Sequence, residues 1–193
     1  TDANLPALAR SLYQTLWIAE VRSATDGNPV HPLNTPPFCD ERQVFTHNGF
    51  ITDFHQQIRP RMLRMLDPAI TADIRGNTDS EYLFACLRQI LLNADDQQPV
   101  SAIQQLYEQV AGMVGDQPAL LNLAVANAGG IYVARHALNH ECPSLYFTTT
   151  DPGFPGAQLV ASERFSGDSG WRAVPEHHVL VLRPKRSPEL LAL

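Results

Sequence analysis

The spacing of apolar residues changes along the chain, and this change separates helical from extended segments. Four leucines between Leu5 and Leu16 follow a helical period, which predicts a first helix over about Leu5–Thr15. The short apolar run Leu16–Val21 indicates a strand. Prolines are dense from Ser23 to about Arg42, where they discourage helix and predict a loop.

A hairpin and a series of helices are predicted next. Gln43–Thr46 indicates a second strand, and Asn48-Gly49 the tight turn of a hairpin into Phe50-Ile51. Thr78 followed by Glu81 matches a capping box at the start of the longest helix. The apolar period after Phe54 predicts these helical segments: one through Ile58 and Leu66 broken near Pro60, then Asp67–Ile74, Thr78–Asn93 and Val100–Val114.

The last third of the chain has the composition of strands. Ala119–Ala126 and Ile131–Arg135 flank Asn127-Ala128-Gly129-Gly130 and predict a β-hairpin. Three more strands are predicted at Ser144–Thr149, Gln158–Ser162 and His178–Arg183. Runs of helices and runs of strands, rather than their strict alternation, favour an α+β layered domain over a parallel sheet. We treat residues 1–193 as one domain, because 44% hydrophobic residues suffice for one core.

Charge and cysteine usage narrow the classes of partner. Fourteen Lys and Arg against 20 Asp and Glu give a net charge of -6, and the one basic cluster is Arg183-Pro184-Lys185-Arg186, so no nucleic-acid partner is expected. No stretch has the length of a membrane-spanning helix, so no membrane partner is expected. Three widely spaced cysteines argue against a disulfide framework and predict a reducing, cytoplasmic setting.

Candidate chemistry concentrates in the loop between Val21 and Ile51 and at the helix that begins near Thr78. Arg22 fits either a surface cation or a bidentate clamp for a carboxylate. Asn48-Gly49 fits either a plain turn or a pair of donors, amide and backbone N–H, for an oxyanion. Asp79 fits either a helix-dipole acid or a partner for a substrate ammonium group.

Other candidate sites are weaker. His136 and His140 have the i, i+4 spacing that binds metal on a helix, but they fall where a strand passes into a loop, so no metal site is expected. Cys39, Cys86 and Cys142 have no base nearby in the sequence, and burial is expected for Cys86 among apolar neighbours. No nucleotide or dinucleotide fingerprint is present, and no cofactor is expected.

Three segments together, VRSATDGNPVHPLNTPPF, FTHNGFITDF and GNTDSEYLF, closely resemble class II glutamine amidotransferases, which are N-terminal-nucleophile hydrolases. A distal stretch with Ala161-Ser162-Glu163, Asp168-Ser169-Gly170-Trp171 and Val174-Pro175 resembles the γ-glutamyl amidohydrolases of ergothioneine biosynthesis. The resemblance spans nearly the whole chain. It implies a four-layer αββα sandwich, in which two antiparallel sheets lie between helical layers.

The resemblance also implies roles for particular residues. Arg22 would bind the α-carboxylate of a glutamyl group and Asp79 its α-ammonium. Asn48 and Gly49 would form the oxyanion hole, and His47 would belong to the substrate-binding set by orienting the turn. A free amino-acid head needs one cation and one anion to hold it, so these roles agree with the residue types.

The chain departs from the class at its start. The class uses a cysteine nucleophile at the mature N-terminus, on a first strand upstream of the VRSAT segment, and nothing after Thr1 corresponds to that strand. We therefore expect a domain that lacks its first strands and is inactive as given. Thr1 is formally an alternative nucleophile, but it precedes an amphipathic helix that the class places just before the VRSAT strand, downstream of its nucleophile.

Three functions follow as expectations. The first is hydrolysis of γ-glutamyl-hercynylcysteine sulfoxide through a cysteinyl thioester. The second is a glutaminase that supplies ammonia to a synthase partner. The third is an inactive amino-acid-binding module that keeps the clamp of Arg22 and Asp79. All three take a small γ-glutamyl or amino-acid ligand, and a homodimer and a synthase partner both stay open.

Overall fold

The computed structural model of the protein describes residues 3–21, 31–94, 98–165 and 170–193. Its helical segments are α1 (Leu5–Ser11), η1 (Pro32–Asn34), η2 (Phe54–Ile58), α2 (Arg59–Met65), α3 (Pro68–Ala72), α4 (Asp79–Asn93) and α5 (Pro99–Val114). Its strands are β1 (Phe38–Cys39), β2 (Gln43–Ile51), β3 (Ala119–Asn127), β4 (Gly130–Arg135), β5 (Ala137–Leu138), β6 (Tyr146–Thr148), β7 (Leu159–Ala161), β8 (Arg172–Ala173), β9 (His178–Leu182) and β10 (Glu189–Ala192).

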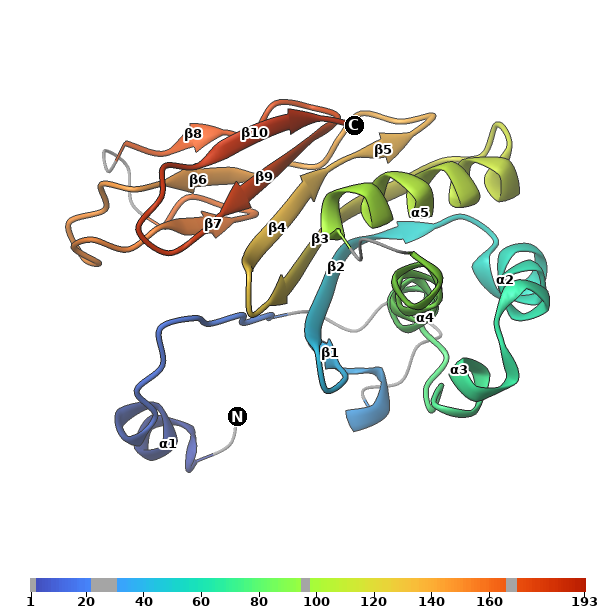
Figure 1. Ribbon diagram of the computed structural model, residues 1–193, viewed down its shortest axis with the longest axis horizontal. Coiled ribbons are helices and arrows are strands. Elements are labelled where there is room, and N and C mark those ends of the chain that lie inside the picture. Colours follow the sequence, from blue (N-terminus) through green and yellow to red (C-terminus); the bar gives the residue numbers. More distant parts are fainter. Residues whose placement is uncertain (1–2, 22–30, 95–97, 166–169) are drawn as a thin grey trace.

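A seven-stranded antiparallel sheet forms the centre of the molecule (Figure 1). Its strand order is β1-β2-β3-β4-β9-β10, and β5 pairs with the start of β3. β2 and β3 pair along their whole length, from Gln43 opposite Asn127 to Ile51 opposite Ala119. A second, three-stranded sheet has the order β7-β6-β8. The long pairing of β2 with β3 is what sets the position of the candidate site.

Both faces of the main sheet are covered, and each has its own core. On one face, Leu121 and Val125 belong to a large apolar cluster with Leu87 of α4 and Leu106 of α5. On the other face, Leu180 belongs to a smaller cluster with residues of the second sheet. Because neither face of β3 meets water, its sequence ALLNLAVAN is almost continuously apolar rather than alternating.

Helix α4 lies inside the helical layer and contacts β2, α2, α3 and α5. It is therefore buried over most of its circumference, not along one stripe. The predicted cap is confirmed, because the Thr78 hydroxyl accepts a hydrogen bond from Glu81 N–H at 3.3 Å. The Glu81 carboxylate in turn accepts from Arg75 N–H and Gly76 N–H, each at 2.8 Å, and so binds the turn before the helix.

The predicted turn at Asn48-Gly49 is wrong. β2 runs unbroken from Gln43 to Ile51, so both residues lie inside a strand. The chain turns later, at Thr52 and Asp53, where Asp53 adopts a left-handed φ of 52°. The physical reason is β3, whose nine residues pair with β2 and hold it extended past the point where an isolated Asn-Gly pair favours a turn.

Other predicted boundaries need smaller corrections. α1 ends at Ser11 rather than near Thr15. In the part of the chain that the structure describes, Leu16–Val21 contains no strand, so the strand predicted there is wrong. The hairpin β3–β4, helix α5 and strand β9 are confirmed near their predicted positions. Strands β1, β5, β8 and β10 were not predicted, because each has only two to four residues, too few for a period to show in the sequence.

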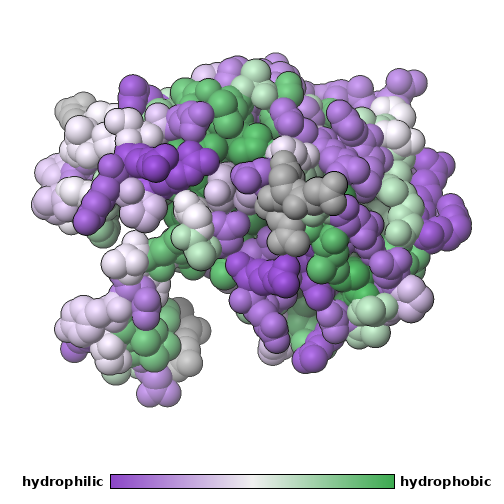
Figure 2. Space-filling model, viewed as in Figure 1, coloured by the Kyte–Doolittle hydropathy of each residue, from purple (hydrophilic) through white to green (hydrophobic). Residues whose placement is uncertain are grey.

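The α1 segment stands apart from the body of the molecule (Figures 1 and 2). None of its residues is buried, and Leu5, Leu8 and Leu12 are exposed at 58%, 52% and 43%. Among the residues that the structure describes, the packed layers are therefore one helical layer and two sheets. No helix in these residues is both long and apolar enough to cross a bilayer.

Candidate active site

The outer edge of β2 presents backbone groups that β3 does not use. Thr52 N–H bonds to Pro118 O on the β3 side, and Asp40 N–H bonds to Gln43 O on the β1 side. Hydrogen-bonding groups alternate along a strand, so odd-numbered residues of β2 direct their N–H groups away from β3. β1 pairs only with Val44 and Phe45. Within the described residues, Gly49 N–H therefore points out of an edge that no strand covers.

Gly49 occupies a position where a side chain has no room. A Cβ built on it would lie 1.9 Å from Leu120 O and 2.9 Å from His47 Nε2. The glycine is thus required by the close approach of β3, and no turn is needed to explain it. It leaves the N–H at this edge unobstructed by a side chain.

His47 is buried, and both of its ring nitrogens have partners. Nε2 lies 2.9 Å from Leu120 O, and Nδ1 lies 3.0 Å from Ser80 Oγ. A carbonyl oxygen only accepts, so Nε2 carries the proton and Nδ1 accepts from the serine hydroxyl in the neutral ring. His47 therefore ties β2 to both β3 and α4, which agrees with an orienting role more than with direct substrate contact.

Asp79 opens helix α4 and faces the same strand edge. Its Oδ2 accepts from Ile51 N–H at 3.0 Å, and its Oδ1 accepts from Ser80 N–H at 2.8 Å. These two backbone donors fix the half-buried carboxylate in one orientation. Since Ile51 and Gly49 lie on the same edge, the carboxylate sits two residues from the exposed N–H.

These residues line a single hollow of about 590 Å³. His47, Asn48, Gly49 and Asp79 all contribute to it, so the structure brings together four of the five predicted site residues. Arg22 lies outside the described residues, although its neighbour Val21 lines the hollow. Sequence reasoning did not find the other lining residues, which are Glu20, Phe50, Ile51, Asp53, Phe54, His55, Gln56, Thr78 and Ser80.

The described lining of this hollow is acidic. Glu20, Asp53 and Asp79 are its only charged side chains of fixed sign within the described residues. Glu20 also contacts the hydroxyl of Thr46 through its Oε2. No sequence signal marked Glu20, because it lies outside the helices and strands and reaches the hollow only through the fold. An acidic wall beside an outward N–H suits a ligand with an ammonium group at one end and a polarised carbonyl at the other.

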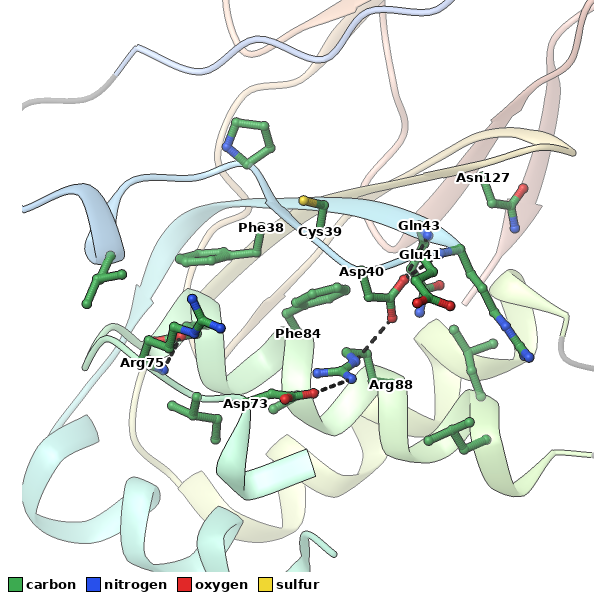
Figure 3. Close-up of a pocket in the computed structure, with 18 of the residues that line it drawn as sticks. Phe38, Cys39, Asp40, Glu41, Gln43, Asp73, Arg75, Phe84, Arg88 and Asn127 are labelled. Atoms are coloured by element: carbon green, nitrogen blue, oxygen red, sulfur yellow. Dashed lines mark hydrogen bonds and ion pairs between the residues drawn. The ribbon is translucent and has the colours of Figure 1, made fainter. Parts of the chain in front are cut away.

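A larger hollow of about 770 Å³ lies beside β1 and α4 (Figure 3). Its central cation, Arg88, is already neutralised: Nε lies 3.1 Å from Asp40 Oδ2, and a terminal nitrogen lies 2.8 Å from Asp73 Oδ2. The guanidinium also lies over the Phe84 ring, 5.8 Å from its centroid. Because these charges are satisfied among themselves, size alone does not make this hollow the candidate site.

His136 and His140, considered from the sequence as a metal-binding pair, have different partners in the structure. His140 Nδ1 lies 3.0 Å from Glu141 O, whereas His136 Nδ1 lies 3.0 Å from Nδ1 of His177. His177 comes from the segment before β9, so this contact could not be read from sequence spacing.

Comparison with known proteins adds independent information. The sequence matches the family described as glutamine amidotransferases class-II over residues 5–160. Two relatives, from Mycolicibacterium smegmatis and Mycobacterium tuberculosis, are named gamma-glutamyl-hercynylcysteine sulfoxide hydrolase. They are 24% and 26% identical over 94% and 95% of this chain. The chain spans 66% of the length of each relative.

Solved structures agree on the fold. A glutamine aminotransferase class-II domain protein from Silicibacter pomeroyi matches with a TM-score of 0.69 and 26% sequence identity. The match covers 84% of this chain and 72% of that protein's chain. The glutamine phosphoribosylpyrophosphate amidotransferase of B. subtilis matches with a TM-score of 0.60 and 14% sequence identity. This match covers 90% of this chain and 34% of the B. subtilis chain. The predicted α+β class and family are both confirmed, and the chain belongs to the class-II glutamine amidotransferases.

Proposed function

We propose that the protein hydrolyses a γ-glutamyl amide and releases glutamate. The observation that carries this proposal is the fixed Asp79 carboxylate, two residues along the same strand edge from the outward N–H of Gly49. The carboxylate suits the α-ammonium of a glutamyl group. The N–H and the Asn48 amide suit the oxyanion that forms when its γ-carbonyl is attacked. Arg22 completes the proposed clamp by binding the α-carboxylate.

The reaction follows from these roles. A cysteine thiolate attacks the γ-carbonyl carbon, and the carbonyl oxygen gains the negative charge that Asn48 and Gly49 stabilise. Collapse of this intermediate breaks the C–N bond, and the amine leaves with a proton. Water then cleaves the thioester and regenerates the thiol. Cys39, Cys86 and Cys142 do not line the hollow, so the proposed nucleophile is the N-terminal cysteine that the class uses.

The finer proposal is that the substrate is the γ-glutamyl conjugate of hercynylcysteine sulfoxide. It is supported by the names of the mycobacterial relatives and by Trp171, Val174 and Pro175 in the distal stretch. Identity of 24–26% leaves the amine half of the substrate as a proposal. The protein expressed from its complete reading frame should release glutamate from this conjugate faster than from glutamine. Ammonia release from glutamine that rises with an added synthase would instead favour the glutaminase function.

Binding by the present chain tests the site separately from catalysis. We expect Asp79→Asn to weaken glutamate binding about 10–100-fold in calorimetric titration, because one charge-assisted contact contributes roughly 1.5–3 kcal/mol. Glu108→Gln, an exposed charge on α5, is the matched control and should bind as the parent does. Unfolding curves are needed as well, because Asp79 also holds Ile51 N–H. Equal affinity in folded Asp79→Asn and the parent would refute the ammonium site.

The oxyanion role is tested by rate. In the protein from its complete reading frame, we expect Asn48→Ala to lower kcat about 100–1,000-fold with a much smaller change in KM. Asn48 is exposed, so the substitution should leave the fold intact. A loss confined to KM would show that Asn48 binds the ground state and not the oxyanion.

A further inference from the structure

A second group of chemically reactive side chains lies at the opposite side of β3 from the candidate active site. Cys142, from the segment between β5 and β6, meets Glu176 and His177, from the segment between β8 and β9. One ligand atom from each, namely a sulfur, a carboxylate oxygen and a ring nitrogen, lies within 4.8 Å of the other two. Cys142 is buried, while Glu176 and His177 are exposed, so the group opens to solvent on one side.

The backbone holds His177 in this position at some cost. His177 has a left-handed φ of 57°, which is uncommon for a residue with a side chain. Its N–H donates to Arg135 O at 2.8 Å, and its carbonyl accepts from Leu193 N–H at 2.9 Å. Both bonds come from neighbouring strand ends, so the unusual conformation is imposed by the sheet. Strained residues of this kind are concentrated at functional sites.

His136 fixes the ring of His177. The two Nδ1 atoms are 3.0 Å apart, and the His136 ring stacks on Tyr107 with centroids 4.3 Å apart. His136 Nε2 is buried and has no hydrogen-bond partner among the described residues. A group that hydrogen-bonds the other ring nitrogen of a ligand histidine orients the ring in metal sites, and His136 holds this position beside His177.

The donor set selects a class of ion. Thiolate, imidazole and carboxylate together suit zinc and similar borderline divalent metals, whereas calcium and magnesium prefer oxygen alone. Bonds of about 2.0–2.3 Å in a tetrahedral site place ligand atoms roughly 3.5 Å apart. The three ligand atoms lie within 4.8 Å of one another and must move closer to reach this spacing when an ion binds, and the open side leaves the fourth position to water.

Arg135 is an unfavourable neighbour because of its positive charge, but its other contacts hold the guanidinium in place. It lies 3.3 Å from Glu176 Oε1 but also donates to the carbonyls of Pro143, Val174 and Cys142. These carbonyl contacts hold the guanidinium beside the group while the half-exposed Glu176 carboxylate has a second oxygen to offer an ion.

We propose that Cys142, Glu176 and His177 form an open zinc-binding site with three protein ligands and water in the fourth position, and that His136 positions His177. The site would join the segment entering β6 to the segment entering β9. It is separate from the candidate active site: the carbonyl of His136 bonds to Leu121 N–H, and Leu121 pairs with Gly49. Two strand spacings, roughly 10 Å, thus separate the two sites within the sheet.

The test uses the whole 193-residue chain, stripped of metal with a chelator, and zinc or cobalt ions alone as the probe. We expect one zinc per chain by calorimetry. With cobalt, we expect the charge-transfer absorption of a thiolate–cobalt bond. Cys142→Ser and His177→Ala should weaken zinc binding by more than about 100-fold, and His136→Ala by about 10–100-fold. Cys39→Ser and His140→Ala, a matched thiol and histidine outside the group, should bind as the parent does.

The cobalt spectrum of the parent protein keeps the test decisive if a variant fails to fold. A parent chain that takes up no zinc, or whose cobalt complex lacks thiolate absorption, overturns the proposal. Binding that survives Cys142→Ser also overturns it. Thermal stability gives a further readout, because an ion that binds only the native state raises the unfolding temperature in proportion to its occupancy.

Discussion

At the scale of single residues, the candidate active site is built from side chains that are held in place by hydrogen bonds within the protein. His47 uses both nitrogens to hold β2 against β3 and α4. Asp79 uses both oxygens to accept backbone N–H groups, yet stays half-exposed toward the hollow. Such fixed groups lose little freedom when a ligand binds, which is the condition for effective electrostatic stabilisation.

Gly49 gives the first prediction. We expect Gly49→Ala to destabilise the protein by about 1–3 kcal/mol, since the new methyl group overlaps Leu120 O and the strands must separate. Gly112→Ala is the matched control: it lies in α5 with open space around it, and should stabilise by about 0.5–1 kcal/mol through helix propensity. Urea unfolding followed by circular dichroism measures both. Equal effects at the two glycines would contradict the close contact.

The cysteines give the second prediction. Burial raises the pKa of the Cys86 thiol to about 12, so it stays protonated and shielded in the native protein. Cys39 is exposed. We therefore expect iodoacetamide at pH 8 to modify Cys39 first, and Cys86 only after denaturation, as measured by peptide mass spectrometry. Burial and then the charge of Glu176 raise the pKa of Cys142, so slow labelling is expected there too. Native labelling of Cys86 at the rate of Cys39 would disprove this order.

At the scale of elements, helix α4 links the catalytic edge to the core. Its first turn supplies Thr78, Asp79 and Ser80 to the hollow, while Leu83 and Leu87 are fully buried in the apolar core. The position of Asp79 therefore depends on where the helix begins. The cap that sets this beginning is a single hydroxyl, the Oγ1 of Thr78.

The cap gives the third prediction. Thr78→Ala leaves Glu81 N–H without its acceptor in a buried setting, and should cost about 0.5–2 kcal/mol of stability. Thr78→Ser keeps the oxygen and should recover most of this loss. Unfolding midpoints of the two variants, compared with the parent, provide the measurement. A serine variant as unstable as the alanine variant would show that Thr78 acts through its methyl group.

At the scale of the whole molecule, two sets of ion pairs differ in their burial and in the segments they connect. Arg88 of α4 joins Asp40, before β2, to Asp73, after α3, and so closes the wall of the larger hollow (Figure 3). Arg183 and Glu189 pair near the surface between β9 and β10. The first bridges three segments, whereas the second spans one short turn.

This contrast gives the fourth prediction. Arg88→Met should destabilise by about 1–2 kcal/mol, because two carboxylates lose a charged donor in a partly shielded place. Arg183→Met, the matched control, should cost about 0–1 kcal/mol. Chemical unfolding at low salt tests the difference. Matching losses in the two variants would mean that the bridge at Arg88 contributes no more than a surface pair.

Much of this protein was determined by its sequence alone. The α+β class, the long helices, the β3–β4 hairpin and the cap at Thr78 follow from local periodicity and local hydrogen bonding. The family follows from three motifs, and four of their residues meet in one hollow. The elements, the cap and the motifs could be predicted because each depends on residues close together in the chain, whereas the meeting of residues from β2 and α4 in one hollow was expected only from the family resemblance.

The tertiary structure decided the rest. An Asn-Gly pair that favours a turn in isolation became strand because β3 pairs along all of β2. Glu20 lines the hollow and Cys142 lies beside His177 because segments far apart in the sequence pack together. No periodic pattern in the sequence indicates such contacts. Local sequence patterns indicate which kind of element a residue favours. They do not indicate which distant strand or helix will pack against it, because that depends on the packing free energy of the whole domain.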